Sequence, residues 1–389
     1  MLKHKSTNIF SEISTFFSEK DDSNAINAIM DIARYLKISE QALSLESSDN
    51  CKHTRLIVLE LLLLFPFFMV KNAFHYSESI LLKVLSCKKD VFYRFMANGS
   101  MDWRKILYRI NLQLIGKIAV RADSCRGKDP VCLIVDDSDL PKTGKRIERL
   151  GRIFSHVTHK SILGFKALFL CRTDGKTQTV LDFSLHGEEG SRPDKPFGMT
   201  REQRQKQYSR ERKETEAVQE RIEEYTQKKI QKAIDMVRRA IKEGIRFDYL
   251  LSDSWFTCTD IVRFIKSRHV RCHFLGMIKM AKTKYRFEGK MKSARELVRL
   301  LQTRKEIRYS RRLSCYYGQA EVELSGIKVK LFFCRRTRNG DWTGLLTTNT
   351  KLDFFEAYHV YSMRWSVEVF FYGKYIIMQS KHSFRLAAA

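Results

Sequence analysis

The sequence contains little proline and no closely spaced pairs of cysteine. Its 5 prolines in 389 residues argue against long disordered linkers, and a hydrophobic content of 43% is enough for packed cores. We therefore expect the chain to be folded nearly throughout. The cysteines number 9 and stand singly, without the close pairs that zinc sites and disulfide frameworks use. We interpret them as reduced thiols in the cytoplasm.

Long hydrophobic runs are also missing. The N-terminus lacks the apolar stretch that follows the basic residues of a secretory signal. The most apolar run, residues 56–70, contains Glu60 and Pro66 and is shorter than the roughly 20 residues needed to cross a bilayer. We expect this run to form a buried helix, broken at Pro66, in a protein without a membrane segment.

Acidic residues are few relative to basic ones. Lys and Arg number 71 against 44 for Asp and Glu, which gives a net charge of +27 at pH 7. Such an excess attracts polyanions and releases their counterions on binding, so nucleic acid is the first expected partner, ahead of an anionic membrane. The charge alone does not distinguish DNA from RNA.

Helical and strand patterns divide the chain near residue 126. Before it, apolar residues recur at spacings of three and four, as in residues 103–114, which predicts an all-helical region. After it, short apolar runs rich in β-branched residues predict strands, and Asp174-Gly175 is typical of a hairpin turn. We expect a mixed α/β fold, an α+β mixed sheet, with strands at 131–135, 162–171, 177–185, 247–251 and 272–278, and helices at 230–241 and 259–267.

Four segments follow from these patterns. Residues 1–126 form the helical region, and residues 127–281 form the first part of the α/β core. Residues 282–349 alternate polar and apolar side chains and are predicted to be a basic, β-rich insertion. Residues 350–389 contain a final helix, from about residue 354, that completes the core and ends in a short tail.

Two aspartates follow predicted strands. Asp137 and Asp253 each stand just past an apolar strand, where the ends of the strands in a sheet commonly open onto a ligand crevice. Magnesium prefers oxygen ligands, and two-metal sites for phosphoryl transfer hold their ions about 3.5–4 Å apart. An Asp after a strand also commonly accepts hydrogen bonds in a turn, and this alternative stays open for each residue alone.

The final predicted helix presents an acid and a base together. Tyr361, Arg364, Glu368, Tyr372 and Tyr375 are separated by three or four residues and therefore share one helical face. An Arg one turn before a metal-binding Glu is suited to hold a DNA phosphate or to orient the carboxylate. An ordinary Arg–Glu pair on a solvated helix is the alternative.

Three further groups are weaker candidates. His156 and His159 have no third metal ligand nearby in the sequence, so we expect them to face solvent or DNA. Trp342 lies at a predicted turn, where it packs in a hairpin or stacks on an extruded base. The turn after the first acid is either solvated or touches the same nucleic acid, through Lys142, Lys145 and Arg146.

Three motifs together resemble those of bacterial insertion-sequence transposases of the DDE superfamily with the Tyr-Arg-Glu-Lys signature. They are Asp-Asp-Ser at 136–138, Ser-Asp-Ser-Trp at 252–255, and Tyr-Ser-Met-Arg-Trp-Ser-Val-Glu at 361–368. That family has an RNase H-like catalytic domain, and the order of strands and helices predicted above is similar. The resemblance covers residues 126–375, while the helical N-terminal region matches only in general character, as the place where such proteins bind DNA ends.

The resemblance implies a metal-dependent DNA reaction. Asp137, Asp253 and Glu368 would hold two Mg²⁺ or Mn²⁺ ions, with Asp136 as the alternative to Asp137. The implied chemistry is nicking at the terminal repeats of a mobile element, followed by attack of the freed 3′-hydroxyl on target DNA. The implied partners are double-stranded DNA and a second copy of the chain, in a homodimer assembled on DNA at the bacterial nucleoid.

The sequence departs from the family's pattern after the glutamate. The resemblance assigns DNA contact or site orientation to Tyr361 and Arg364, but the signature lysine position holds Tyr375, with Lys374 one residue early. Further helices usually follow in the family, so we also expect a shortened copy. A degenerate transposase that binds DNA without cutting it is therefore the alternative. A cellular nuclease would share the acids without joining DNA ends, and a basic RNA-binding protein would not need them.

Overall fold

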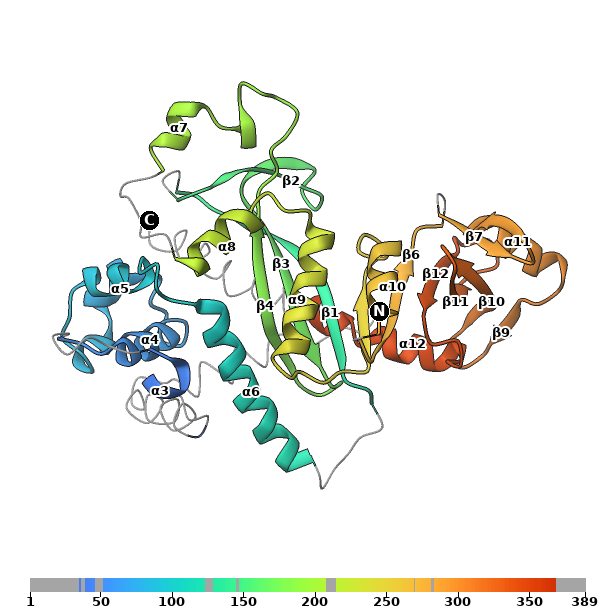
Figure 1. The fold of residues 1–389 in the computed structure, drawn as a ribbon, viewed down its shortest axis with the longest axis horizontal. Coiled ribbons are helices and arrows are strands. Elements are labelled where there is room, and N and C mark those ends of the chain that lie inside the picture. Colours follow the sequence, from blue (N-terminus) through green and yellow to red (C-terminus); the bar gives the residue numbers. More distant parts are fainter. Residues whose placement is uncertain are drawn as a thin grey trace. The chain divides into compact units, whose positions relative to one another are not determined.

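A computed structural model describes residues 35, 39–45, 52–122, 129–144, 147–207, 215–268, 270–280 and 283–368. The chain divides into two compact units, residues 1–125 and residues 126–389. Figure 1 shows both units coloured along the sequence. In the described residues, none of the helices is both long and apolar enough to cross a membrane.

The first unit contains helices and no strand among its described residues, as predicted. Its core joins the rings of Phe65, Tyr76 and Phe92, whose centroids lie 4.6 to 5.9 Å apart. The apolar run around Leu61 forms a helix that ends before Pro66, which has no amide hydrogen to continue it. The helices are α3 (Glu40–Leu43), α4 (Arg55–Leu64), η1 (Ala73–Glu78), η2 (Ile80–Lys83), α5 (Lys89–Met96) and α6 (Trp103–Ala122).

The described residues of the second unit form one mixed sheet of 12 strands. Their order is β2-β3-β1-β5-β6-β12-β11-β10-β7-β8, with β4 beside β3 and β9 beside β10. The bounds are β1 (Cys132–Pro141), β2 (Gly151–Ser155), β3 (Lys160–Thr173), β4 (Gln178–His186), β5 (Tyr249–Ser252), β6 (His273–Ile278), β7 (Lys284–Phe287), β8 (Lys290–Ser293), β9 (Arg308–Ser310), β10 (Cys315–Leu324), β11 (Ile327–Arg335) and β12 (Thr343–Thr347).

The strands around β1 set the geometry of this unit. β1 pairs antiparallel with β3 and parallel with β5, and β5 pairs parallel with β6. The five predicted strands are confirmed as β1, β3, β4, β5 and β6, and the hairpin turn at Asp174-Gly175 places Gly175 at a φ of 83°. β2 was not predicted, because a five-residue strand with two large apolar side chains gives a weak periodic signal.

The predicted end of the first strand was wrong. The apolar run stops at Val135, but β1 continues to Pro141 because β3 pairs with it along its whole length, up to Pro141 opposite Gly164. Asp136 and Asp137 therefore lie within the strand, and their side chains point to opposite faces of the sheet.

Helices cover both faces of the sheet. On one face, α9 packs its apolar side on β3 and β4 and contacts α10. On the other face, α12 packs against the sheet in a core that contains Ile134, Leu251 and Phe354. Figure 1 shows α9 crossing in front of β3 and β4. The helices of this unit are η3 (Pro196–Gly198), α7 (Arg201–Gln205), α8 (Glu216–Glu224), α9 (Lys229–Lys242), α10 (Thr259–Ile265), α11 (Ala294–Thr303) and α12 (Phe354–Ser362).

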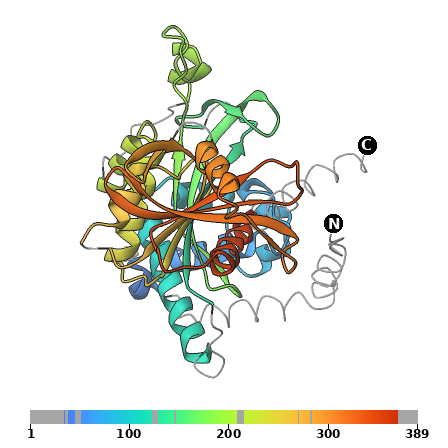
Figure 2. The ribbon, with the colours of Figure 1, turned by 90° about the vertical axis from the view of Figure 1, so that its right-hand side faces the viewer.

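The β-rich segment after residue 282 extends the same sheet. β12 pairs antiparallel with β6, and β11 and β10 follow outward. α11 begins at a capping box in which Ser293 and Glu296 satisfy each other's backbone amides. Figure 2 views this part of the molecule from the front, with these strands in orange.

Candidate active site

Asp136 in β1 and Asp253 just after β5 lie at the same level of the sheet. β1 and β5 are parallel neighbours in which Val135 stands opposite Ser252, so the two aspartates are the next residues in register. This level is the carboxyl end of β5, and open sheets commonly bind ligands at the carboxyl ends of their strands.

The Asp136 carboxylate is buried against an arginine from the far end of the chain. Its side chain is 14% exposed, and its Oδ2 lies 3.2 Å from Nη1 of Arg364. Burial raises the pKa of Asp136, Arg364 lowers it and the nearby charge of Asp253 raises it, and together they bring the pKa to about 7. Burial therefore disfavours the charged form of this carboxylate even with Arg364 beside it.

Asp253 is held by the turn that it begins. Its Oδ1 accepts hydrogen bonds from the amides of Trp255, at 2.9 Å, and Phe256, at 3.1 Å. The hydroxyl of Thr257 donates to the Asp253 backbone oxygen at 2.8 Å. These bonds restrain the carboxylate, and no described residue hydrogen-bonds to its Oδ2. Turn hydrogen bonds at Asp253 were the alternative that the sequence left open, and the structure contains them.

Arg364 joins Asp136 to Glu368. Its guanidinium forms an ion pair with each carboxylate, through Nη1 to Asp136 and through Nη2 to Glu368. The Arg364 side chain is 12% exposed, and the side chain of Glu368 is 34% exposed. Acids from β1 and from the end of the described chain are thus held at one cation, although 228 positions separate Asp136 from Arg364.

The segment that carries Arg364 is not the continuous α-helix that the sequence predicted. α12 ends at Ser362, Met363 and Arg364 form a turn, and helical geometry resumes at residue 365. The amides of Arg364 and Val367 bond to oxygens three residues earlier, at 3.0 and 3.1 Å, which is the tighter 3₁₀ spacing. The tighter turn still leaves Arg364 and Glu368 in contact.

Tyr361 lies beside the same guanidinium. The Arg364 carbon Cζ is 5.6 Å from the centre of the Tyr361 ring. Burial raises the pKa of Tyr361 to about 12, although the charge of Arg364 lowers it. Its hydroxyl therefore stays protonated at neutral pH.

Asp137 faces the other side of the sheet. Its Oδ2 accepts a hydrogen bond from Nζ of Lys229, the first residue of α9, at 2.5 Å. The same ammonium lies 4.4 Å from the centre of the Trp255 ring. Asp137 is thus paired with a lysine, whereas Asp136 shares its arginine with Glu368.

Comparison with known proteins shows the family of this chain. A family model described as "DDE superfamily endonuclease" matches residues 78–287, which include Asp136, Asp137 and Asp253. The chain belongs to the DDE superfamily of endonucleases. No curated protein matches it in sequence.

Among solved structures, we compare one that is similar to this DDE-superfamily chain at a low level. It is the cryo-EM structure of a piggyBac transposase synaptic complex with hairpin DNA, 12% identical, with a TM-score of 0.37. The match covers 92% of this chain and 66% of that chain, so the present chain spans just under two thirds of the longer protein.

The acids of this DDE-superfamily chain suit divalent cations in their chemistry. Asp136, Asp253 and Glu368 are hard oxygen donors, which Mg²⁺ prefers, and the raised pKa of Asp136 reflects burial that a cation would compensate. Within the described residues, no three acid, His or Cys side chains are close enough together to hold an ion. Arg364 instead contacts two of the three acids.

Other residues expected at the site lie apart from it or outside the described residues. Lys142 follows the end of β1, six residues and therefore about 20 Å along the strand from Asp136, and its amide donates to the Leu163 oxygen at 2.8 Å. His156 and His159 are exposed, and Trp342 packs against Arg335 at 4.6 Å. Outside the described residues lie Lys145, Arg146, Tyr372, Lys374 and Tyr375.

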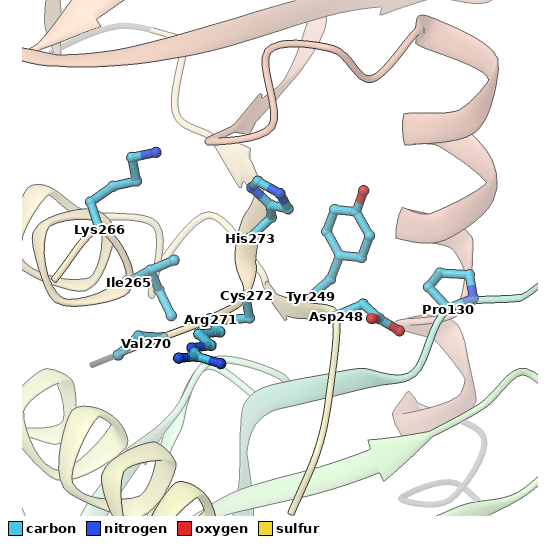
Figure 3. A pocket seen from close by; sticks show the side chains of 9 residues that line it. All are labelled: Pro130, Asp248, Tyr249, Ile265, Lys266, Val270, Arg271, Cys272 and His273. Carbon is cyan, nitrogen blue, oxygen red and sulfur yellow. The ribbon is translucent and has the colours of Figure 1, made fainter. Parts of the chain in front are cut away.

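A cavity in this unit lies at the opposite end of the strands β5 and β6. Its volume is about 600 Å³, and Figure 3 shows its lining, which includes Asp248, Tyr249 and His273. These residues stand at or just before the starts of β5 and β6, whereas Asp253 follows the end of β5. This cavity is therefore distinct from the acid cluster.

Sequence reasoning missed Lys229 and Trp255 as neighbours of the acids. Trp255 was quoted only as part of a motif, and Lys229 lay in a long charged stretch. The available signal was the position of Lys229 at the start of an amphipathic helix, although its partner on β1 is 92 positions away. That separation hides the contact from any local pattern.

Proposed function

We propose that this chain is a DNA transposase that uses divalent metal ions to cut DNA at the ends of a mobile element and to join those ends to target DNA. The observation that carries this proposal is the convergence of acids from three places in the chain. Asp136 and Asp253 are adjacent in register, and Arg364 links Asp136 to Glu368.

The arrangement of strands supports the proposal. An antiparallel group on one side of β1 and the parallel strands β5 and β6 on the other are what an RNase H-like catalytic domain requires. We propose that β7 to β12 and α11 are an insertion into that domain, and that residues 1–126 bind the element's ends.

Asp136 is proposed as the first metal ligand in preference to Asp137. Its carboxylate lies on the face where Arg364 and Glu368 meet, whereas Asp137 pairs with Lys229 on the other face. Asp136, Asp253 and Glu368 would then hold two Mg²⁺ or Mn²⁺ ions. Such ions lower the pKa of the attacking water or 3′-hydroxyl and stabilise the leaving oxygen.

The protein groups have roles of their own in this reaction. Arg364 offsets part of the charge of Asp136 and Glu368 before loading, and its guanidinium is suited to two-point contact with the scissile phosphate once the acids are bound to metal ions. Asp253 is kept in place by the Trp255 and Phe256 amides. The protonated Tyr361 hydroxyl is suited to donate a hydrogen bond to a phosphate oxygen.

Double-stranded DNA is the proposed substrate, both as element ends and as target. The net charge of +27 favours a polyanion, and we include Lys142, Lys145, Arg146 and Lys374 among the proposed DNA contacts. We also propose that two copies act together as a homodimer on DNA, in a bacterial cytoplasm. The low similarity to a transposase–DNA complex is not needed for these steps.

A degenerate copy that binds DNA without cutting it is the second candidate. The observation that favours it is Arg364, which already forms ion pairs with two of the three acids. In such a copy, these pairs would persist in the presence of metal ions.

Cleavage and joining of DNA test the proposal directly. Purified protein would be incubated with Mg²⁺ or Mn²⁺ and a supercoiled plasmid carrying the DNA that flanks its gene, beside Asp253→Asn and Glu368→Gln. We expect the wild type to nick and join the ends, and both variants to bind DNA without cutting it. Binding without nicking by the wild type would support the degenerate copy. Nicking without joining would support a nuclease.

A further inference from the structure

Lys330 is a buried cation in β11, on the face of the sheet that α12 covers. It shares that face with Phe332, two residues further along the strand, whose ring lies 6.2 Å from the ring of Phe354 in α12. Its side chain is 8% exposed, and it forms no ion pair among the described residues, including Glu321 opposite it in β10. Burying an ammonium is costly unless oxygens accept its hydrogens, so its partners indicate its role.

The oxygens that accept from Lys330 lie in the chain that leads into α12. Its Nζ donates to the backbone oxygen of Leu352 at 2.9 Å and to that of Thr350 at 3.3 Å. Leu352 directly precedes Asp353, the N-cap of α12, whose Oδ1 accepts from the Glu356 amide at 2.8 Å. Lys330 therefore joins β11 to the point where α12 begins.

An aromatic contact holds the same end of α12 on the β-rich segment. Phe354, the first residue of α12, stacks on Tyr317 in β10, with ring centroids 4.5 Å apart and ring planes 11° from parallel. Figure 1 shows α12 next to these strands. The start of α12 is thus held by strands that follow residue 282 in the chain.

The other end of α12 leads to the acid site. Phe354, Met363 and Val367 belong to one buried core. Arg364 and Glu368 directly follow the last two of these residues. A buried core is close-packed and transmits small displacements, so a shift at the start of α12 would reach the ion pair of Arg364 and Glu368.

We propose that Lys330 is a positioning residue for the acid site, an inference that rests on the proposed function. By holding the chain at Leu352, its ammonium sets where α12 lies on the sheet, and thereby where Glu368 stands relative to Asp136 and Asp253. The β-rich segment then contributes to metal binding without supplying a ligand. Removing a group that orients a metal ligand typically lowers metal affinity or activity about 10- to 100-fold.

Hydrogen exchange of α12 tests the first part of this role. Lys330→Met keeps much of the apolar stem and removes the ammonium. The matched control is Lys328→Met, at an exposed lysine two positions earlier in the same strand. Exchange would be measured in EDTA by mass spectrometry, on peptides from α12 and from α9, which packs on the other face. In Lys330→Met, we expect α12 to exchange about 10- to 100-fold faster, the range for one lost hydrogen bond to a charged group, and α9 to be unchanged.

The Mg²⁺ requirement tests the second part. The Mg²⁺ concentration for half-maximal plasmid nicking should rise about 10-fold in Lys330→Met, while the affinity for DNA in EDTA and the results for Lys328→Met match the wild type. Lys330→Arg, which keeps the charge and the donors, should restore most of the wild-type Mg²⁺ requirement. A variant that was only less stable would unfold at lower urea concentration without a changed Mg²⁺ requirement.

The outcomes separate this proposal from the proposed function. Slow exchange of α12 in Lys330→Met, exchange that is faster in α9 to the same degree, or an unchanged Mg²⁺ requirement would each overturn the positioning role. If Lys330→Met does not fold, Lys330→Gln, whose amide still donates, takes its place under the same criteria. A wild type that does not nick rejects the proposed function itself. A wild type that nicks beside a variant with an unchanged Mg²⁺ requirement rejects only this inference.

Discussion

The two faces of β1 place neighbouring carboxylates in different electrostatic settings. On the α12 face, Asp136 lies near Asp253 and shares Arg364 with Glu368, and its pKa is raised to about 7. On the α9 face, Asp137 has a lysine of its own, Lys229, at 2.5 Å. The first face has more negative than positive groups, whereas the second is balanced.

This difference indicates which face is built for chemistry. A buried group of acids with too few cations destabilises the folded protein, so it is expected where a metal ion or a substrate supplies the missing charge. An isolated, partly exposed Asp–Lys pair contributes little beyond local structure. Substitutions on the two faces should therefore have unequal effects on catalysis and on stability.

The largest expected effect is the difference in DNA cleavage between variants at two adjacent residues, Asp136 and Asp137. Asp136→Asn should lower the cleavage rate about a thousand-fold or more, because a metal ligand contributes several kcal/mol to the transition state. Asp137→Asn should stay within about ten-fold of the wild type, since its partner is Lys229. The measurement is plasmid nicking at saturating Mg²⁺. Equal losses in both variants would contradict the distinction between the two faces.

The next effect is on stability and concerns Arg364. Arg364→Ala should lower the free energy of unfolding by about 3 kcal/mol at pH 8 in EDTA, because it leaves the mostly buried Asp136 and the partly exposed Glu368 without their cation. Mg²⁺ should restore part of this loss by binding to the folded state alone. Urea unfolding with and without Mg²⁺ measures both terms. Arg364→Lys is the control that keeps a positive charge. If Mg²⁺ stabilised Arg364→Ala no more than it stabilises the wild type, that result would argue against metal binding by these acids.

The pH dependence of stability should differ in sign between the faces. His186, on the α9 side, has a folded pKa of about 4 against 6.5 unfolded, so the unfolded chain binds more protons below pH 6.5. Its contribution is present at pH 7 and falls by about 2 kcal/mol by pH 5. Asp136 has a raised folded pKa, so the folded protein takes up the proton first and acidification below pH 7 stabilises it.

Paired variants separate these two contributions. In urea unfolding between pH 7 and pH 5, His186→Gln should flatten the loss of stability on acidification, and Asp136→Asn should steepen it. Gln can keep a donor for the Gln227 oxygen, so the comparison is made between folded proteins. If both variants changed the slope in the same direction, one of the two pKa assignments would be refuted.

The central strands were predictable from sequence because they are buried on both faces. Residues 131–135 and 247–251 are nearly continuous apolar runs, and continuous runs of this length are typical of interior parallel strands. The hairpin at Asp174-Gly175 was predictable from its turn chemistry. The three regions that carry the acids were also identified, because each follows or contains a recognisable motif.

The geometry of the site was not predictable to the same degree. The end of β1 depends on pairing with β3, in which Pro141 lies opposite Gly164, and no local pattern contains that information. Side-chain alternation shows that Asp136 and Ile134 share a face, but it does not show that α12 covers that face. The proposal that Asp136 rather than Asp137 is a metal ligand therefore needed the fold.

The smallest expected effect is on the balanced face. Lys229→Met keeps the apolar stem but removes the ammonium from Asp137 and from the Trp255 ring, and it should lower the free energy of unfolding by about 1 kcal/mol. A double-mutant cycle with Asp137→Asn should give a coupling energy of about 0.5 kcal/mol, since both side chains are partly exposed. Urea unfolding at low salt measures the cycle. A coupling as large as the loss in Arg364→Ala would mean that Asp137 depends on its cation as strongly as Asp136 does, and the contrast between the two faces of β1 would not hold.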